Sequence, residues 1–91
     1  MKNLEEIKRL RDSGADTDTV ISELSEYIAA SPEDDEALTM RGMAYWSKGE
    51  RSNAINDYLA AVKINPESRA KLALKATYEI LDYYNKDLYN P

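Results

Sequence analysis

The sequence repeats itself with a period of 34 residues, and this period limits the folds open to the chain. Two similar segments, Ser-Pro-Glu-Asp at 31–34 and Asn-Pro-Glu-Ser at 65–68, stand one period apart. The same shift pairs apolar or small residues along the chain: Leu4 with Leu38 and Leu72, Val20 with Ala54, Ile21 with Ile55, Leu24 with Tyr58, Ile28 with Val62, and Gly42 with Ala76. A repeat of this length indicates a supersecondary unit stacked on copies of itself.

Turn-forming residue pairs divide the chain into segments of helical length. They stand at 13–14, 31–32, 48–49 and 65–66, and segments of roughly 12–16 residues between them are too long for ordinary strands. The predicted helices cover 2–13, 17–30, 33–47, 51–63 and 67–85. Short connections make neighbouring helices antiparallel. Since 91 residues suit a single domain, we predict an all-α domain of five antiparallel helices.

The ends of these helices carry recognisable residues. Ser31 and Asn65 are expected N-caps, each followed by a proline at the first helical position, where a missing amide hydrogen costs nothing. Asp16 or Thr17 is expected to cap the second helix. Gly14 and Gly49 suit the left-handed conformation that often ends a helix.

The middle of the chain resembles the tetratricopeptide repeat family. Seven of the family's eight preferred positions fit within 35–68, and Arg41 departs from a packed leucine. The positions are Leu38, Arg41-Gly42, Tyr45, Ala54, Tyr58, Ala61 and Pro66. The resemblance implies a right-handed α-solenoid of about two and a half helix pairs. It divides the chain into an N-terminal repeat (1–34), a central repeat (35–68) and a closing helix with its tail (69–91).

Side-chain size predicts how these helices pack. Gly42 and Ala54 lack bulk, so two helices are expected to cross closely there, beside Tyr45 and Tyr58. Arg41 is expected to lay its methylene groups along the interface, with its guanidinium in water or paired with an acid. An apolar stripe is expected to seat the closing helix on the preceding repeat: Leu72, Ala73, Ala76, Ile80, Leu81 and Tyr84.

Composition argues against catalysis and against metal binding. The chain has no histidine and no cysteine, which removes the commonest general base, thiolate nucleophiles and almost every zinc site. Asp12, Asp16 and Asp18 lack the order of ligands that a calcium loop needs, and the acids at 33–36 point in different directions around a helix. We therefore predict a chain that is not an enzyme, with no cofactor and no metal.

Charge and hydropathy narrow the class of partner. The net charge of −5 opposes binding to nucleic acid or to anionic lipid. Apolar runs of only a few residues cannot span a bilayer, and a charged N-terminus is unlike a signal peptide. We expect a cytoplasmic chain whose partner is a protein or peptide.

The resemblance implies that this partner lies in a concave groove lined by the first helix of each pair. The matching residues are Glu5, Arg9, Glu36, Thr39, Met40, Met43, Trp46, Ala73 and Thr77. Met43 and Trp46 are the predicted apolar anchors. Thr39 and Glu36 are the predicted polar contacts, and Arg9 is the predicted cation. Packing between helices is an alternative role for Met40, Met43 and Trp46. The carboxylate clamp of chaperone-binding members is rejected, because Arg9 alone is basic among Glu5, Arg9, Met40, Ala70 and Leu74.

A second functional hypothesis concerns the tyrosine-rich end of the chain. Tyr83, Tyr84, Leu88 and Tyr89 could form an exposed patch that joins two copies in a weak homodimer. The alternative to a peptide-binding module is therefore a structural, self-associating protein.

Overall fold

Five helices build the chain, as predicted. The computed structural model describes residues 1–89, and it describes side chains as far as Tyr83. The helices are α1 (Leu4–Asp12), α2 (Thr17–Ala30), α3 (Asp35–Ser47), α4 (Arg51–Ile64) and α5 (Ala70–Tyr89). No strand is present in this described part, so the all-α prediction is confirmed.

Two helix starts differ from the prediction. Ser31 ends α2 instead of capping the next helix, and α3 begins only after Asp34, whose carboxylate accepts a hydrogen bond from the Ala37 amide at 3.1 Å. After Asn65 the chain makes turns, and α5 begins at Ala70. A proline also suits the second position of a turn, and this is the role that Pro32 and Pro66 take, rather than the first position of a helix.

Other helix ends agree with the sequence. Gly14 and Gly49 have positive φ angles of 92° and 83°, which a residue with a Cβ rarely adopts. Asp16 caps α2 by accepting a hydrogen bond from the Thr19 amide at 2.7 Å. Hydrogen bonding to the Thr19 side chain, and then to this amide, lowers the pKa of Asp16 below its ordinary value. Asn3 and Glu6 form a capping box at the start of α1, which the sequence reading missed.

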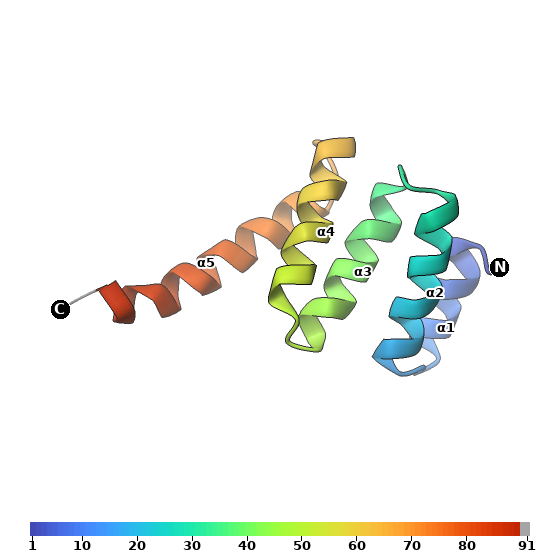
Figure 1. The fold of residues 1–91 in the computed structure, drawn as a ribbon, viewed down its shortest axis with the longest axis horizontal. Coiled ribbons are helices and arrows are strands. Elements are labelled where there is room, and N and C mark those ends of the chain that lie inside the picture. The colour runs from blue at the N-terminus through green and yellow to red at the C-terminus, as the bar shows by residue number, and fades with distance from the viewer. Residues whose placement is uncertain (90–91) are drawn as a thin grey trace.

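The helices stack as successive pairs. Figure 1 shows α1 behind α2, α3 between α2 and α4, and the start of α5 behind α4. We call α1 and α2 the first helix pair, and α3 and α4 the second. The far end of α5 runs away from the stack, which gives the molecule extents of 52 × 28 × 18 Å.

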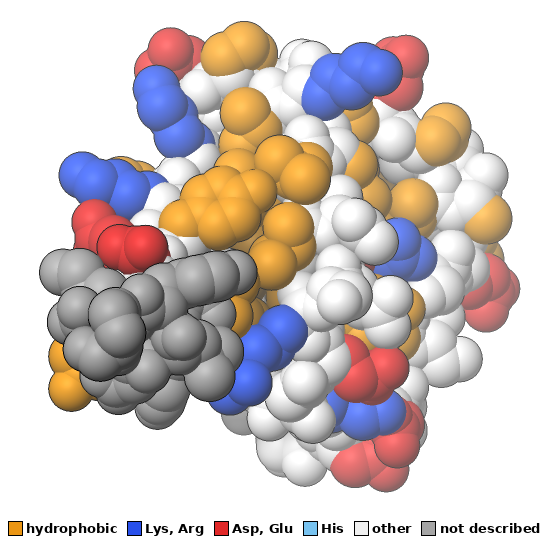
Figure 2. All heavy atoms as spheres, turned by 60° about the vertical axis from the view of Figure 1, so that its left-hand side comes forward, with side chains coloured by type: hydrophobic (Ala, Val, Ile, Leu, Met, Phe, Trp, Pro, Cys, Tyr) orange, Lys and Arg blue, Asp and Glu red, His pale blue; other side chains and the backbone are white. Residues whose placement is uncertain are grey.

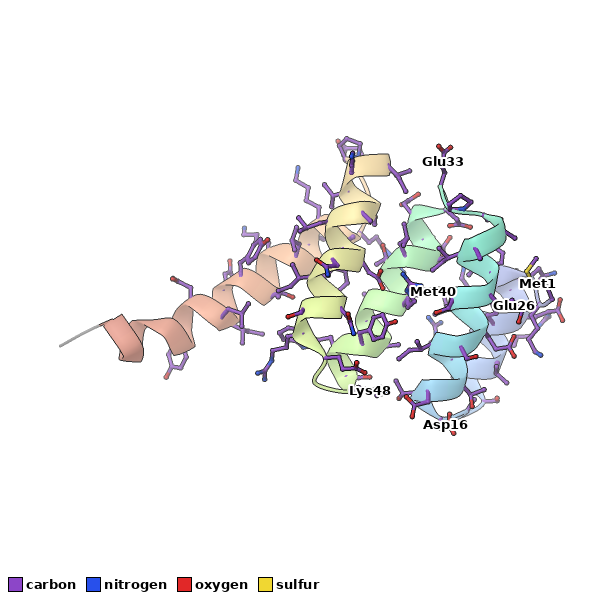
Figure 3. All side chains as sticks on the ribbon, in the orientation of Figure 1. Met1, Asp16, Glu26, Glu33, Met40 and Lys48 are labelled. Carbon is purple, nitrogen blue, oxygen red and sulfur yellow. The ribbon has the colours of Figure 1, made fainter. Side chains whose placement is uncertain are left out.

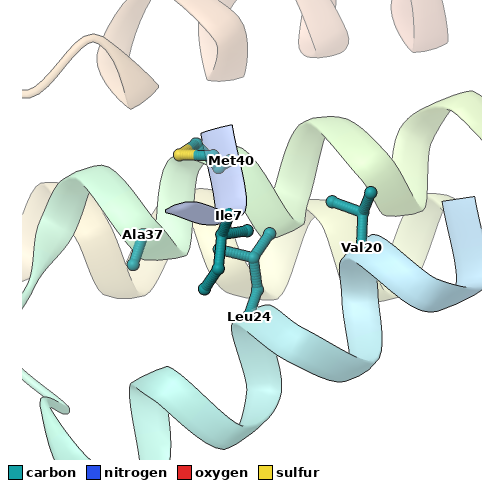
Figure 4. Packing of buried hydrophobic residues seen from close by; sticks show 5 residues of the cluster. All are labelled: Ile7, Val20, Leu24, Ala37 and Met40. Carbon is teal, nitrogen blue, oxygen red and sulfur yellow. The ribbon is translucent and has the colours of Figure 1, made fainter. Parts of the chain in front are cut away.

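An aliphatic cluster joins the first helix pair to α3. Ile7 and Leu24 are fully buried, with Val20, Ala37 and Met40 around them (Figure 4). Apolar side chains from three helices meet here, so the first pair and α3 share one core.

A second cluster, built on small residues, joins α3, α4 and α5. It consists of Leu38, Ala54, Tyr58, Ala61 and Ala70. A Cβ added at Gly42 would stand 2.6 Å from Cε1 of Tyr58 and 3.3 Å from the Ala54 carbonyl oxygen. The predicted close crossing at Gly42 is therefore present, and no side chain fits beneath the tyrosine ring.

Arg41 is less exposed than predicted. Its Nε and Nη2 donate hydrogen bonds to the two carboxylate oxygens of Asp57, each at 2.8 Å, and its Nη1 donates to Ser25 Oγ at 3.2 Å. The hydrogen bonds to Asp57 raise the pKa of Arg41 above its ordinary value. The expected acidic partner is present, but the guanidinium lies among three helices instead of in water.

The apolar stripe expected to seat α5 is only partly correct. Ala70 and Thr77 are buried and Ala73 is half-buried, whereas Leu72 and Ile80 are 72% and 42% exposed. The physical reason is that α5 turns the side of Ala70, Ala73 and Thr77 toward the stack, which leaves Leu72 on another side of the helix. Ile80 lies further along, where α5 leaves the stack. Tyr84 lies outside the described side chains. Figure 2 shows the molecule from the side on which the far end of α5 lies. Hydrophobic side chains gather near the centre of this face, and charged side chains lie around them.

Candidate protein-binding site

A small hollow lies between the start of α2 and the second half of α3. Its volume is about 310 Å³, and Met43, 45% exposed, stands at its surface. Buried Val20 and Met40 are among its walls. The full lining is Arg11, Ala15, Thr17, Val20, Met40, Met43, Ala44 and Ser47. The walls are mainly apolar, so the hollow suits an uncharged side chain of another molecule. We call it the Met43 hollow.

A polar hollow of about 380 Å³ lies near the start of α3. It is lined by Asp35, Glu36, Thr39, Asn65, Glu67, Ser68 and Arg69. Thr39 is buried there: its Oγ1 donates to the Asp35 carbonyl oxygen at 2.8 Å and lies 3.3 Å from Ser68 Oγ. Thr39 therefore joins α3 to the turn that precedes α5, and the predicted polar contact at Glu36 lies on the exposed rim.

Lys8 connects the acidic residues predicted on the two helices. Its Nζ lies 2.5 Å from Glu36 Oε1 and 3.3 Å from Glu5 Oε1. The hydrogen bond to Glu36 raises the pKa of Lys8 above its ordinary value. Both predicted glutamates thus form ion pairs with one lysine that sequence reasoning left out, although Lys8 occupies a position where the repeat prefers glycine. Arg9, one residue further, is exposed.

The remaining predicted residues are not gathered at one surface. Met40 is 4% exposed and belongs to the aliphatic cluster between α1, α2 and α3. Trp46 packs against the second cluster, with the Arg51 guanidinium carbon 5.5 Å from the centre of its ring. Thr77 is buried and Ala73 is half-buried against the same cluster. Trp46 therefore lies outside the Met43 hollow. The two predicted anchors, Met43 and Trp46, do not share one binding surface.

Several lining residues of the Met43 hollow were missed because they lie at helix ends. Arg11 and Ala15 flank the first turn, and Ser47 ends α3. An antiparallel stack brings these ends together, as the ion pair between Lys48 and Asp18 shows. Figure 3 places Lys48 and Asp16 at the same end of the molecule. Helix lengths and direction could have indicated this neighbourhood.

Comparison with known proteins agrees with this architecture. A family model described as tetratricopeptide repeat matches residues 35–68. The chain also matches the solution NMR structure of Bacteroides fragilis protein BF1650 with a TM-score of 0.79 and 38% identity, over 99% of this chain and 91% of that one.

The chain belongs to the tetratricopeptide repeat family.

Two curated relatives of this repeat protein are much longer. Over 48 residues it is 42% identical to cellulose synthase operon protein C of Escherichia coli K12 and to the putative protein of that name in strain O157:H7. The matched segment is 53% of this chain and 4% of each relative's length.

Two structural findings bear on membranes and metals. In residues 1–89 of the repeat protein, no helix has both the length and the apolar character needed to cross a membrane. Within the same range, histidine, cysteine, aspartate and glutamate side chains form no group of three or more placed to hold a metal ion.

Proposed function

We propose that this repeat protein is a non-catalytic module that binds a peptide segment in a groove along α3. Repeats of its family generally mediate contacts between proteins. The observation that carries the proposal is the Met43 hollow, where a flexible, half-exposed thioether stands above buried apolar walls. Methionine adapts its shape to a bound side chain, so this hollow is the proposed anchor point.

The polar hollow beside Thr39 supplies the second part of the proposed groove. Asp35 and Glu67 offer carboxylate oxygens, and Arg69 offers a guanidinium, so the lining presents both hydrogen-bond donors and acceptors. Such a lining suits the backbone of an extended peptide. An apolar anchor at one end of α3 and polar contacts at the other would fix the peptide's direction along the helix.

The test uses peptides selected from a displayed random library on the purified chain. We expect the Met43→Ala variant to bind the selected peptides about tenfold more weakly, because an anchor in a pocket carries much of the binding energy. Trp46→Ala is the matched control, since Trp46 lies outside the hollow, and far-UV circular dichroism checks that both variants are folded. Unchanged affinity in Met43→Ala would place the groove elsewhere.

Two further predictions accompany this proposal. The predicted cytoplasmic location rests on the sequence alone. The weak homodimer involves Tyr84, Leu88 and Tyr89, which lie outside the described side chains, and sedimentation at two concentrations would test it.

A further inference from the structure

The α5 helix has the register of a first helix in a third repeat, but the described chain provides no second helix beside it. A shift of 34 residues carries Leu38 to Leu72, Gly42 to Ala76 and Trp46 to Ile80. Leu38 is 5% exposed beneath α4, whereas Leu72 is 72% exposed. Ala76 is exposed and Ile80 is 42% exposed. We call Leu72, Ala76 and Ile80 the open face of α5.

The second helix pair shows what covers such a face. There α4 lies antiparallel on α3, with Ala54 and Tyr58 against Gly42. One charged contact sets the register, because Asp57 of α4 holds Arg41 through two hydrogen bonds. In α5 the residue equivalent to Arg41 is Lys75, which is exposed.

These equivalences define the chemistry of a helix that would cover the open face of α5. It would need an acidic residue opposite Lys75 and a small residue near Ala76. A tyrosine ring placed as Tyr58 is would meet the Ala76 methyl, since a Cβ at Gly42 stands only 2.6 Å from that ring. An aliphatic side chain at this place avoids the collision.

We infer that the open face of α5 docks an amphipathic helix of another protein, antiparallel to α5, with an acid opposite Lys75 and aliphatic residues against Leu72 and Ala76. The face continues the stacking surface that already joins α3 to α4. Neither α2 nor α4 of a second copy can take this place, because both helices bury the residues concerned: Val20, Leu24, Ala54 and Tyr58. The inference concerns a different surface from the proposed groove.

The probe is a synthetic peptide with the sequence of α4, residues 51–64, carrying Tyr58→Leu and blocked ends. Binding is followed by NMR on the full isotope-labelled chain, which maps weak contacts residue by residue. We expect saturable shifts at the amides of Leu72, Ala76 and Ile80. The Leu72→Asp chain should bind at least tenfold more weakly, whereas Met43→Ala should bind as the wild type does, so failure of the groove and failure of this site are distinguishable.

A charge exchange tests the register. The same peptide with Asp57→Lys should bind the wild-type chain at least fivefold more weakly and should recover on the Lys75→Glu chain. Absence of saturable shifts on α5, no effect of Leu72→Asp, or no recovery in the exchange would overturn the inference. It would also be overturned if the chain alone showed the same shifts at high concentration and sedimented as a dimer, because the occupant would then be a second copy.

Discussion

The two helix pairs of this repeat protein are packed with different kinds of residue. In the first pair, Ile7 and Leu24 are fully buried aliphatic side chains. One period later their places are taken by Arg41, which is hydrogen-bonded to Asp57, and by the ring of Tyr58. An aliphatic core thus holds the first pair, whereas a ring on a glycine and a charged contact hold the second.

The difference shows that one repeat position can hold residues of very different size and polarity in the two pairs. Tyr58 is large, and the residue facing it, Gly42, has no side chain. Leu24 is shorter, and the residue at the position equivalent to Gly42 is Lys8, whose stem leads to an ion pair with Glu36. The second pair sets a large ring against a glycine, whereas the first pair has a leucine and a lysine stem at the same two positions. A substitution at one position should therefore have different effects in the two pairs.

The largest expected effect comes from adding one methyl group at the second crossing. Gly42→Ala should lower the free energy of unfolding by about 2 kcal/mol, although alanine is the better helix former, because the new Cβ meets the Tyr58 ring. Urea unfolding measures the change. The matched Lys8→Ala variant should shift the midpoint far less.

A double variant sharpens this expectation. Tyr58→Leu combined with Gly42→Ala imitates the leucine of the first pair and should recover part of the stability lost in Gly42→Ala. Simple additivity of the two losses would show that the collision with the ring is not the cause.

The charged contact of the second pair should have a smaller effect. Asp57→Ala leaves a partly buried guanidinium without its main partner and should cost about 1.5 kcal/mol. Glu23→Ala is the equivalent change in the first pair, where Glu23 and Lys2 lie 3.7 Å apart at the surface, and it should cost less than about 0.5 kcal/mol. Replacing both partners, with Arg41→Ile and Asp57→Ala, should destabilise less than Asp57→Ala alone. A greater loss in the double variant would contradict this account.

The smallest expected effect concerns alkaline pH. Burial raises the pKa of Tyr58 above its ordinary value of 10.0, so the unfolded chain releases this proton first as the pH increases. Stability should therefore decline as the pH rises past that value. Tyr58→Phe removes this contribution and should show a shallower decline between pH 9 and 11, measured by urea unfolding. Equal declines in the two chains would mean that Tyr58 titrates alike in both states.

Sequence reasoning succeeded best where one requirement of the backbone, such as a positive φ angle or a close approach, selects the residue. Gly14 and Gly49 adopt the left-handed conformation expected of them. Gly42 lies at the close crossing for which the repeat pattern selects a small residue. The start of α3 was misplaced because Ser31, Pro32 and Asp34 all carry start signals, and only the folded chain shows which carboxylate reaches an amide.

The residues of the candidate site were harder to predict from the sequence, because the burial of a side chain depends on neighbours far along the chain. Met40 and Met43 are three residues apart, which separates their directions by about 60° around a helix. That small angle is enough to bury Met40 beneath α1 and α2 and to leave Met43 half-exposed. Residues 72 and 80 look apolar enough for a core, and they are exposed because the described chain lacks a helix to cover them.

Asp34 links the folding of α2 to the folding of α3. Its Oδ1 caps α3, and its Oδ2 accepts a hydrogen bond of 2.7 Å from the hydroxyl of Tyr27, near the end of α2. In such arrays, folding cooperativity arises from the coupling between adjacent units. Fraying of α2 would withdraw the tyrosine from the residue that starts α3, so the first two repeats should melt as one cooperative unit, with α5 as the part of the array able to unfold by itself.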